Sequence, residues 1–315
     1  MKILGLLLIS LMACSDIKKG KDHAATTSFS DNFSVNLTIL GIVQDAGFPQ
    51  AQCEKSCCRS VWGRPEKQQK VVSLGLSDSQ NGKCWLFEAT PDLRSQLQQL
   101  TRSGMSMDGI FLTHAHIGHY TGLMYLGRES MGAQAVPVYA MPRMRSFLES
   151  NGPWDQLVKL KNISLKPLEN RQKIRLSTNV SISPILVPHR DEYSETVGYL
   201  IEGPSRKALF IPDIDKWEKW EENIDVWIQR IDYAFLDATF FDEKELPGRD
   251  MAEIPHPFVK ESMQRFEELG KKERAKVHFI HFNHSNPLID PQSAASQKVL
   301  QAGFKIAREG MQFEM

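Results

Sequence analysis

The sequence predicts a mixed α/β fold in one large domain. Short apolar runs rich in β-branched residues recur along the chain, helical apolar stripes fall between some of them, and several runs end in a histidine or an aspartate. The 315 residues are 41% hydrophobic and 24% charged, which is typical of a globular protein with a large core. The formal net charge is +0 and the sequence has no prominent basic cluster, so it carries no electrostatic footprint for nucleic acid.

The sequence predicts three helices and ten strands. We expect helices that start near Pro91 with Thr90 as the cap, near Pro257 with Gly270 as the stop, and near Pro291. Their apolar stripes belong to the core. The pattern alone establishes only that α and β elements are mixed. The expected strands cover 35–43, 71–76, 84–87, 110–113, 136–140, 180–187, 196–201, 208–211, 233–236 and 277–282.

The N-terminus has the layout of an export signal. A lysine precedes the apolar run 3–12, which is too short to span a bilayer. The run closes on Leu-Met-Ala-Cys14, which resembles a bacterial lipobox and implies a signal peptide over 1–13 with lipid on Cys14. Residues 14–32 then read as a flexible tether, and 33–315 as the folded domain. The resemblance implies an exported lipoprotein that faces the periplasm or the cell surface and contacts the membrane only through its lipid. A plain secretory signal with an incidental cysteine is the alternative.

Three histidines within six residues form the most specific motif of the chain. His114-Ala-His116-Ile-Gly118-His119 follows an apolar, strand-like run. An extended backbone points His114 and His116 to one side, and a turn at Gly118 can bring His119 to the same centre. Imidazole suits zinc, and a catalytic zinc keeps three protein ligands and an open position for water. A histidine-rich loop without a metal is the alternative.

The order His-x-His-x-Asp-His after a strand is the signature of the metallo-β-lactamase superfamily, which the chain resembles over nearly its whole mature length. The resemblance implies a four-layer αββα sandwich. It also calls for later ligands at strand ends, and His189, Asp213 and His281 each end a β-prone run. The implied ligands are His114, His116 and His189 for one metal, His119 and His281 for the second, and Asp213 as the bridge.

Gly118 departs from the signature because it stands where the superfamily has aspartate. The second metal thereby loses one ligand, so we expect one or two active-site metals, the second held weakly. Zinc is the first choice, with iron or manganese as alternatives. Asp191 is a conceivable replacement ligand. The substitution Gly118→Asp is expected to raise occupancy of the second metal if the turn tolerates a side chain.

A cysteine cluster suggests a further metal. The stretch Gly47–Gln50, followed by cysteines, resembles the pyrroloquinoline quinone biosynthesis B family and the cyclic-phosphate phosphodiesterases of the phosphonate pathway. In those relatives a Cys-x-Cys-x-x-Cys pattern, joined in the phosphodiesterase by a late histidine, holds structural zinc. Here Lys55 replaces the middle cysteine, and a disulfide remains open because exported proteins sit in an oxidising compartment. The implied zinc ligands are Cys53, Cys57, Cys58 and His284.

The implied chemistry is hydrolysis of a small-molecule phosphodiester or related ester by a metal-activated water held at Asp213. His256 precedes an expected helix, where ribonuclease Z and the phosphodiesterases carry a catalytic histidine, and is the candidate proton donor. Arg249 is a candidate phosphate clamp. Two alternatives stay open: an iron oxygenase like the quinone biosynthesis B proteins, and a non-catalytic lipoprotein that binds a metal or ligand. The sequence predicts no oligomeric state.

Overall fold

Two seven-stranded β-sheets occupy the centre of the protein in the computed structural model, which describes residues 35–102, 104–248, 250 and 253–315. The first sheet has the strand order β14 (Gln312–Glu314), β1 (Val35–Gly41), β2 (Ser73–Asp78), β3 (Lys83–Phe87), β4 (Ser106–Phe111), β5 (Val136–Ala140) and β6 (Ile163–Pro167). The second has the order β13 (Lys305–Ile306), β12 (Val277–Ile280), β11 (Tyr233–Asp237), β10 (Lys207–Ile211), β9 (Val197–Glu202), β8 (Ser181–Leu186) and β7 (Ile174–Arg175).

Both sheets are mixed in the same way. Strands β3 to β6 run parallel to one another, as do β10 to β13, while the remaining neighbours pair antiparallel. Parallel neighbours need long crossover connections, and most of these carry helices. Because parallel strands end at the same edge of a sheet, the loops that follow them gather there, where α/β proteins usually place their sites.

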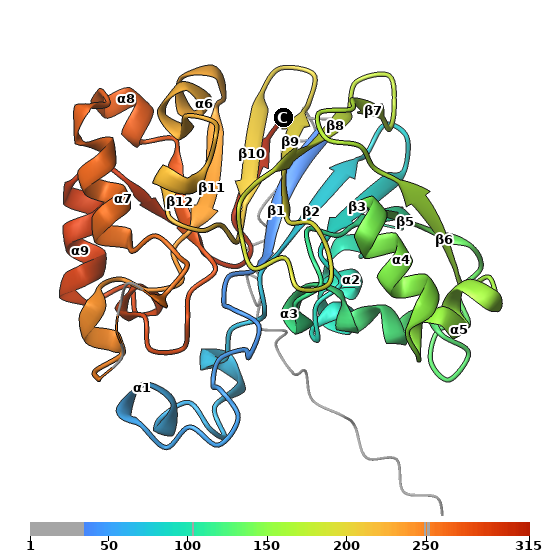
Figure 1. Cartoon of the computed structure of the whole chain (residues 1–315), viewed down its shortest axis with the longest axis horizontal. Coiled ribbons are helices and arrows are strands. Elements are labelled where there is room, and N and C mark those ends of the chain that lie inside the picture. Colours follow the sequence, from blue (N-terminus) through green and yellow to red (C-terminus); the bar gives the residue numbers. More distant parts are fainter. Residues whose placement is uncertain (1–34, 103, 249, 251–252) are drawn as a thin grey trace, which may run out of the picture. The chain divides into compact units, whose positions relative to one another are not determined.

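Helices cover the outer faces of the sheets. Figure 1 shows α2 to α5 beside the first sheet and α6 to α9 beside the second, which confirms the expected αββα order. The helices are α1 (Ser56–Arg59), α2 (Leu93–Thr101), α3 (Ile117–Tyr120), α4 (Pro142–Ser150), α5 (Trp154–Lys159), α6 (Ile224–Arg230), α7 (Val259–Arg265), α8 (Lys271–Arg274) and α9 (Ala294–Gln301). Short 3-10 turns lie at Pro65–Lys67, Thr121–Leu126, Trp217–Lys219, Glu243–Glu245, Phe266–Glu268 and Pro287–Ile289.

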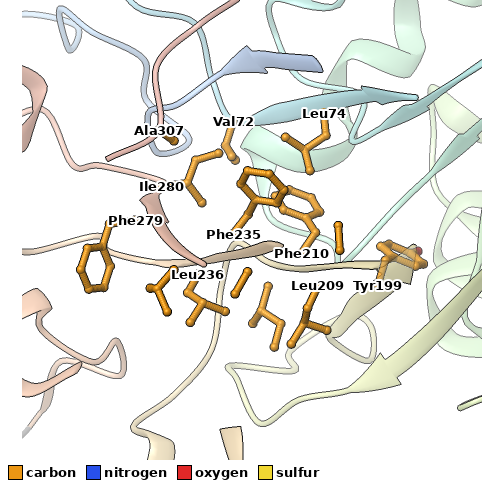
Figure 2. Close-up of a cluster of buried hydrophobic side chains, with 14 of the residues drawn as sticks. Val72, Leu74, Tyr199, Leu209, Phe210, Phe235, Leu236, Phe279, Ile280 and Ala307 are labelled. Atoms are coloured by element: carbon orange, nitrogen blue, oxygen red, sulfur yellow. The ribbon is translucent and has the colours of Figure 1, made fainter. Parts of the chain in front are cut away.

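The main core lies between the two sheets. Successive residues of a strand point to opposite faces, so Phe210 and Phe235 project toward Leu74 of β2 and toward Val72, which directly precedes that strand, as Figure 2 shows. Leu209, the neighbour of Phe210, projects from the opposite face of the same sheet. All of these side chains are almost completely buried. This packing fixes the two sheets against each other, and with them the loops that leave their ends.

All ten expected strands exist, with ends shifted by a few residues. Several helix ends differ from the prediction. The helix expected from about Pro291 begins at Ala294, with Ser293 as its N-cap. The first helix begins at Leu93 with Asp92 as its N-cap, because the Thr90 hydroxyl accepts a hydrogen bond from the Asp92 amide and donates to Gln96. The helix after Pro257 ends at Arg265 and continues as a 3-10 turn, so Gly270 instead caps the start of α8.

The predicted signal peptide (1–13), the tether (14–32) with Cys14, and Arg249 lie outside the described residues. Within the part of the chain that the structure describes, no helix is long and apolar enough to cross a membrane.

Candidate metal centre

The six predicted active-site ligands come together where several strands end. His114 and His116 lie between β4 and α3, and His119 lies within α3. His189, Asp213 and His281 follow β8, β10 and β12 in the other sheet. The two sheets therefore contribute ligands from opposite sides of one site. Loops carry the side chains, and the packed strands fix where each loop begins.

The first group of ligand atoms comprises His114, His116 and His189, whose ring nitrogens all lie within 4.8 Å of one another. Nε2 of His114 is 2.8 Å from Nδ1 of His116. The other ring nitrogen of His114 bonds the Thr113 hydroxyl at 2.9 Å, which directs Nε2 toward the other two imidazoles. These three imidazoles match the ligand set expected for the first metal.

Asp213 connects the first group to a second. Its Oδ2 lies 3.1 Å from Nε2 of His119 and 3.1 Å from Nε2 of His281, while its Oδ1 lies 3.7 Å from Nε2 of His189. Burial alone would raise the pKa of Asp213, but the charges of His281 and His119 hold it well below its usual range. The carboxylate is therefore ionised and placed to bridge two cations.

Unpaired buried atoms indicate that this site fits metal ions. Among the described residues, both ring nitrogens of His119 and of His189, Nε2 of His281 and Oδ2 of Asp213 are buried without a hydrogen-bond partner. Each such atom costs about 1–3 kcal/mol unless something satisfies it. Imidazole nitrogen and carboxylate oxygen are ligands that zinc accepts, so a bound metal would satisfy most of these atoms together.

Asp45 joins the second group, and sequence reasoning missed it. Its Oδ1 lies 3.2 Å from Nε2 of His119 and accepts a hydrogen bond from the Gly118 amide at 3.0 Å. With His119 and His281 it forms a set of three potential ligands. The clue was present, because Asp45 follows an expected strand just as the other ligands do.

The suggested replacement ligand Asp191 was wrong. Its Oδ1 accepts a hydrogen bond from the Thr196 hydroxyl at 2.7 Å, and it belongs to none of the potential ligand groups among the described residues.

Glu88 contacts His119 of the second group at Nδ1, the ring nitrogen that does not face Asp213. It is completely buried, its Oε1 lies 3.3 Å from Nδ1 of His119, and its Oε2 accepts a hydrogen bond from the Thr113 amide at 3.3 Å. Burial lowers the pKa of His119, but the charge of Glu88 and the contacts with Asp213 and Asp45 raise it well above the ordinary value. Glu88 thus directs one ring nitrogen of His119 toward itself and the other toward the site.

His256 lies beside Asp213 and is held in place by the buried carboxylate of Asp237. Its Nδ1 lies 2.8 Å from Oδ2 of Asp237, whose Oδ1 accepts a hydrogen bond from the Thr239 hydroxyl at 2.7 Å. Burial lowers the pKa of His256, but the charge and hydrogen bond of Asp237 raise it above the ordinary value. Although His256 Nδ1 is also 3.7 Å from Asp213, its bond to Asp237 leaves Nε2 as the nitrogen available to a substrate. The Thr239 hydroxyl also bonds Nδ1 of His281 at 2.9 Å.

The cysteine cluster closes around one point. Nδ1 of His284 lies 3.6, 3.5 and 3.4 Å from the sulfurs of Cys53, Cys57 and Cys58, and neighbouring sulfurs are 3.9 Å apart. Tetrahedral zinc bonds imply about 3.8 Å between two sulfurs and about 3.6 Å between sulfur and nitrogen. A disulfide needs about 2.0 Å. The four cysteines that the structure describes are all unbridged, and the fourth, Cys84, is buried elsewhere.

Comparison with known proteins places these features in a family. A family model described as a β-lactamase superfamily domain matches residues 85–282. The coenzyme PQQ synthesis protein B of Methylococcus capsulatus is 25% identical over 308 residues, with 88% of this chain and 98% of the relative covered. Its counterpart from Klebsiella pneumoniae is 26% identical over 312 residues, with 87% and 96% covered.

Solved structures give the same fold. Zinc-bound PqqB from Methylobacterium extorquens aligns with a TM-score of 0.74 at 19% identity, covering 89% of this chain and 100% of that one. A diphosphatase of the PhnP family aligns with a TM-score of 0.66 at 22% identity, covering 89% and 98%. The matched residues include the histidine motif and extend through His281, so the chain belongs to the β-lactamase superfamily and has the metallo-β-lactamase fold.

Proposed function

We propose that this protein is a metal-dependent hydrolase that cleaves a phosphodiester or a related ester. One observation carries the proposal: a histidine bonded to a buried carboxylate, His256 with Asp237, stands beside a ligand set joined by Asp213. Such a site combines places for metals with a separate group that can donate a proton.

The metals, when bound, would supply an activated water and would polarise the group under attack. His114, His116 and His189 would hold one ion, His119 and His281 the other, and Asp213 both. His256 has its Nδ1 proton fixed on Asp237, so its Nε2 can protonate the leaving oxygen. The bond from Thr239 to the same carboxylate keeps Asp237 in place. Asp237 is therefore a positioning residue for His256.

The exposed edge of the site suggests how a substrate enters. The side chains of His116 and Asp45 are 17% and 18% exposed, whereas His119 and His189 are completely buried. Arg190 directly follows the predicted ligand His189 in the sequence and is exposed. A cation at the edge favours an anionic substrate such as a phosphodiester.

Hydrolysis of bis-(p-nitrophenyl) phosphate by the zinc-loaded protein tests this function. His114→Ala and His189→Ala should lose both the first metal and turnover, because each removes a ligand. His256→Ala should keep its metals and slow turnover by roughly 100-fold or more. His278→Gln changes a buried histidine of β12 outside the site and is the matched control. Full activity in His256→Ala would assign the proton to another donor, and no turnover by the metal-loaded wild type would reject the hydrolase.

A second candidate function is a step in PQQ synthesis, favoured by relatives that carry that name and align over most of both chains. In that case the protein should consume oxygen with a peptide tyrosine substrate. Oxygen uptake separates this candidate from the hydrolase, and iron in the protein as isolated would favour it, whereas zinc would fit both candidates because a PqqB structure is zinc-bound. A protein that binds metal and does neither reaction would be a binding protein.

Two further features belong to the proposal. Cys53, Cys57, Cys58 and His284 hold a structural zinc, supported by their spacing. Cys14 anchors an exported lipoprotein to a membrane, supported by the sequence pattern alone. The expected partners are therefore a small-molecule substrate and a lipid surface.

A further inference from the structure

We propose that Asp45 replaces the aspartate missing from the histidine motif, as a ligand of the second metal, and that Gly118 must be glycine to make room for it. The proposal concerns metal binding and rests on the proposed metal centre. The second metal then does not lack a ligand, contrary to the expectation from the sequence. The carboxylate of Asp45, on the loop after β1, takes the place of the motif aspartate.

The space around Gly118 supports this exchange. A β-carbon added to Gly118 would lie 2.2 Å from Oδ1 of Asp45, 2.5 Å from its Cα and 3.0 Å from its Cβ. Contacts this short do not occur between real atoms, and one of them involves backbone, which cannot rotate away. A motif aspartate and Asp45 therefore cannot occupy their places together. The φ of Gly118 is not positive, so its backbone conformation does not require glycine. Glycine is required there because a β-carbon would overlap Asp45.

The contacts of Asp45 place its carboxylate among the ligands of the second group rather than in solvent. Oδ1 is 3.2 Å from Nε2 of His119, and its side chain is 18% exposed. The Gly118 amide donates to the same oxygen at 3.0 Å. The backbone amide of Gly118 thus helps to orient the carboxylate of Asp45.

The loop that carries Asp45 is tied to the ligand-bearing strand of the other sheet. The Gln44 amide donates to the Phe282 carbonyl at 2.9 Å, and Val43 pairs with Phe282 as an isolated bridge. Phe282 directly follows His281, the other histidine of the second group. Asp45 and His281 are therefore fixed relative to each other by backbone hydrogen bonds.

Metal stoichiometry tests the exchange without any assay of activity. The full-length protein, its Asp45→Asn variant and the control Asp191→Asn are saturated with Zn²⁺, separated from unbound metal by gel filtration, and analysed for zinc per chain. Asp45→Asn keeps the shape and an oxygen that can accept from Gly118. It should lose one zinc, with affinity for that ion reduced by more than the roughly 10–100-fold that an outer partner contributes. Asp191→Asn should match the wild type.

Gly118→Ala supplies an independent arm. Because its β-carbon displaces Asp45 and supplies no new ligand, it should lose the same zinc. Gly118→Asp displaces Asp45 but returns a carboxylate to the motif, so it exchanges one ligand for another and should not raise occupancy above that of the wild type. Unchanged zinc content and affinity in Asp45→Asn would overturn the proposal, as would a wild type with one active-site zinc. A wild type that binds both ions but hydrolyses no phosphodiester would instead reject the proposed function and leave the role of Asp45 intact.

Discussion

At the scale of single residues, the metal centre contains backbone conformations that side chains usually avoid. Glu88 has φ of +75° and His281 has φ of +69°, and neither is glycine. Such conformations cost about 1–3 kcal/mol each and persist where the surroundings fix them. Glu88 faces His119, and His281 is itself a predicted ligand. The strain therefore lies in residues that aim or form the second group.

Removing the charge of Glu88 should weaken the second metal. Glu88→Gln keeps the shape but removes the negative charge that lies 3.3 Å from Nδ1 of His119, so the ring loses the ion-pair partner that directs Nε2 to the site. We expect affinity for the second ion to fall about 10–100-fold, the usual effect of losing such a partner. Competition with a zinc chelator measures it. Asp78→Asn, at a buried carboxylate outside the site, is the control. Equal affinities in Glu88→Gln and wild type would show that Glu88 does not orient His119.

At the scale of elements, the sequence predicted what depends on local pattern. Each of the ten apolar runs became a strand, and His114, His189 and His281 were expected together because each ends such a run. Four strands of the described residues were not expected. Strands β7, β13 and β14 have two or three residues each, too few to show a period, whereas β6 has five residues and was missed although it is as long as several predicted strands. Asp45, Glu88 and Asp237 were missed as site residues, although each follows an expected strand as the predicted ligands do. Position alone does not assign their roles, which depend on contacts with distant segments, such as the 3.2 Å approach of Asp45 to His119.

The packing between the sheets should dominate stability. Phe210 is completely buried between them, with its ring 6.2 Å from that of Phe87 on the opposite sheet. Phe210→Ala should lower the free energy of unfolding by about 3–5 kcal/mol, because it removes buried apolar surface and leaves a cavity. Denaturant unfolding of the metal-loaded protein measures the change, and exposed Tyr193→Ala is the control. A loss below about 1 kcal/mol would mean that the sheets repack freely around the gap.

At the scale of the whole molecule, the N-terminal pattern predicts where the protein resides. If Cys14 carries lipid, the mature chain should partition into detergent, and Cys14→Ser should yield a soluble or uncleaved product. Mass spectrometry of the N-terminal peptide checks this directly. A native protein with an unmodified residue 14, or one cleaved after it, contradicts the lipoprotein prediction.

The cysteine cluster and the active site share their supporting loops. Asp45 and Cys53 lie on one segment, and His281 and His284 lie on another. A zinc held by Cys53, Cys57, Cys58 and His284 would join these two segments a few residues from the atoms that form the second metal group. Because the site is closed, its binding energy is also folding energy. The structural zinc should therefore stabilise the fold and, together with the backbone hydrogen bond between Gln44 and Phe282, help to hold Asp45 and His281 in place.

Loss of the structural zinc should lower both thermal stability and affinity for the second metal, while the first metal remains. Cys58→Ala and His284→Ala test this, because each removes one ligand of the closed site without touching the active-site ligands. Cys84→Ala, which removes a buried thiol outside the cluster, is the matched control. Thermal unfolding and zinc titration are measured on each variant. In the wild type, zinc in the cluster should remain bound after mild chelation has removed zinc from the active site. If Cys58→Ala and His284→Ala lose stability but bind the second metal as tightly as Cys84→Ala, the two sites are independent. If a disulfide joins any two of Cys53, Cys57 and Cys58 in the native protein, the structural zinc itself is wrong.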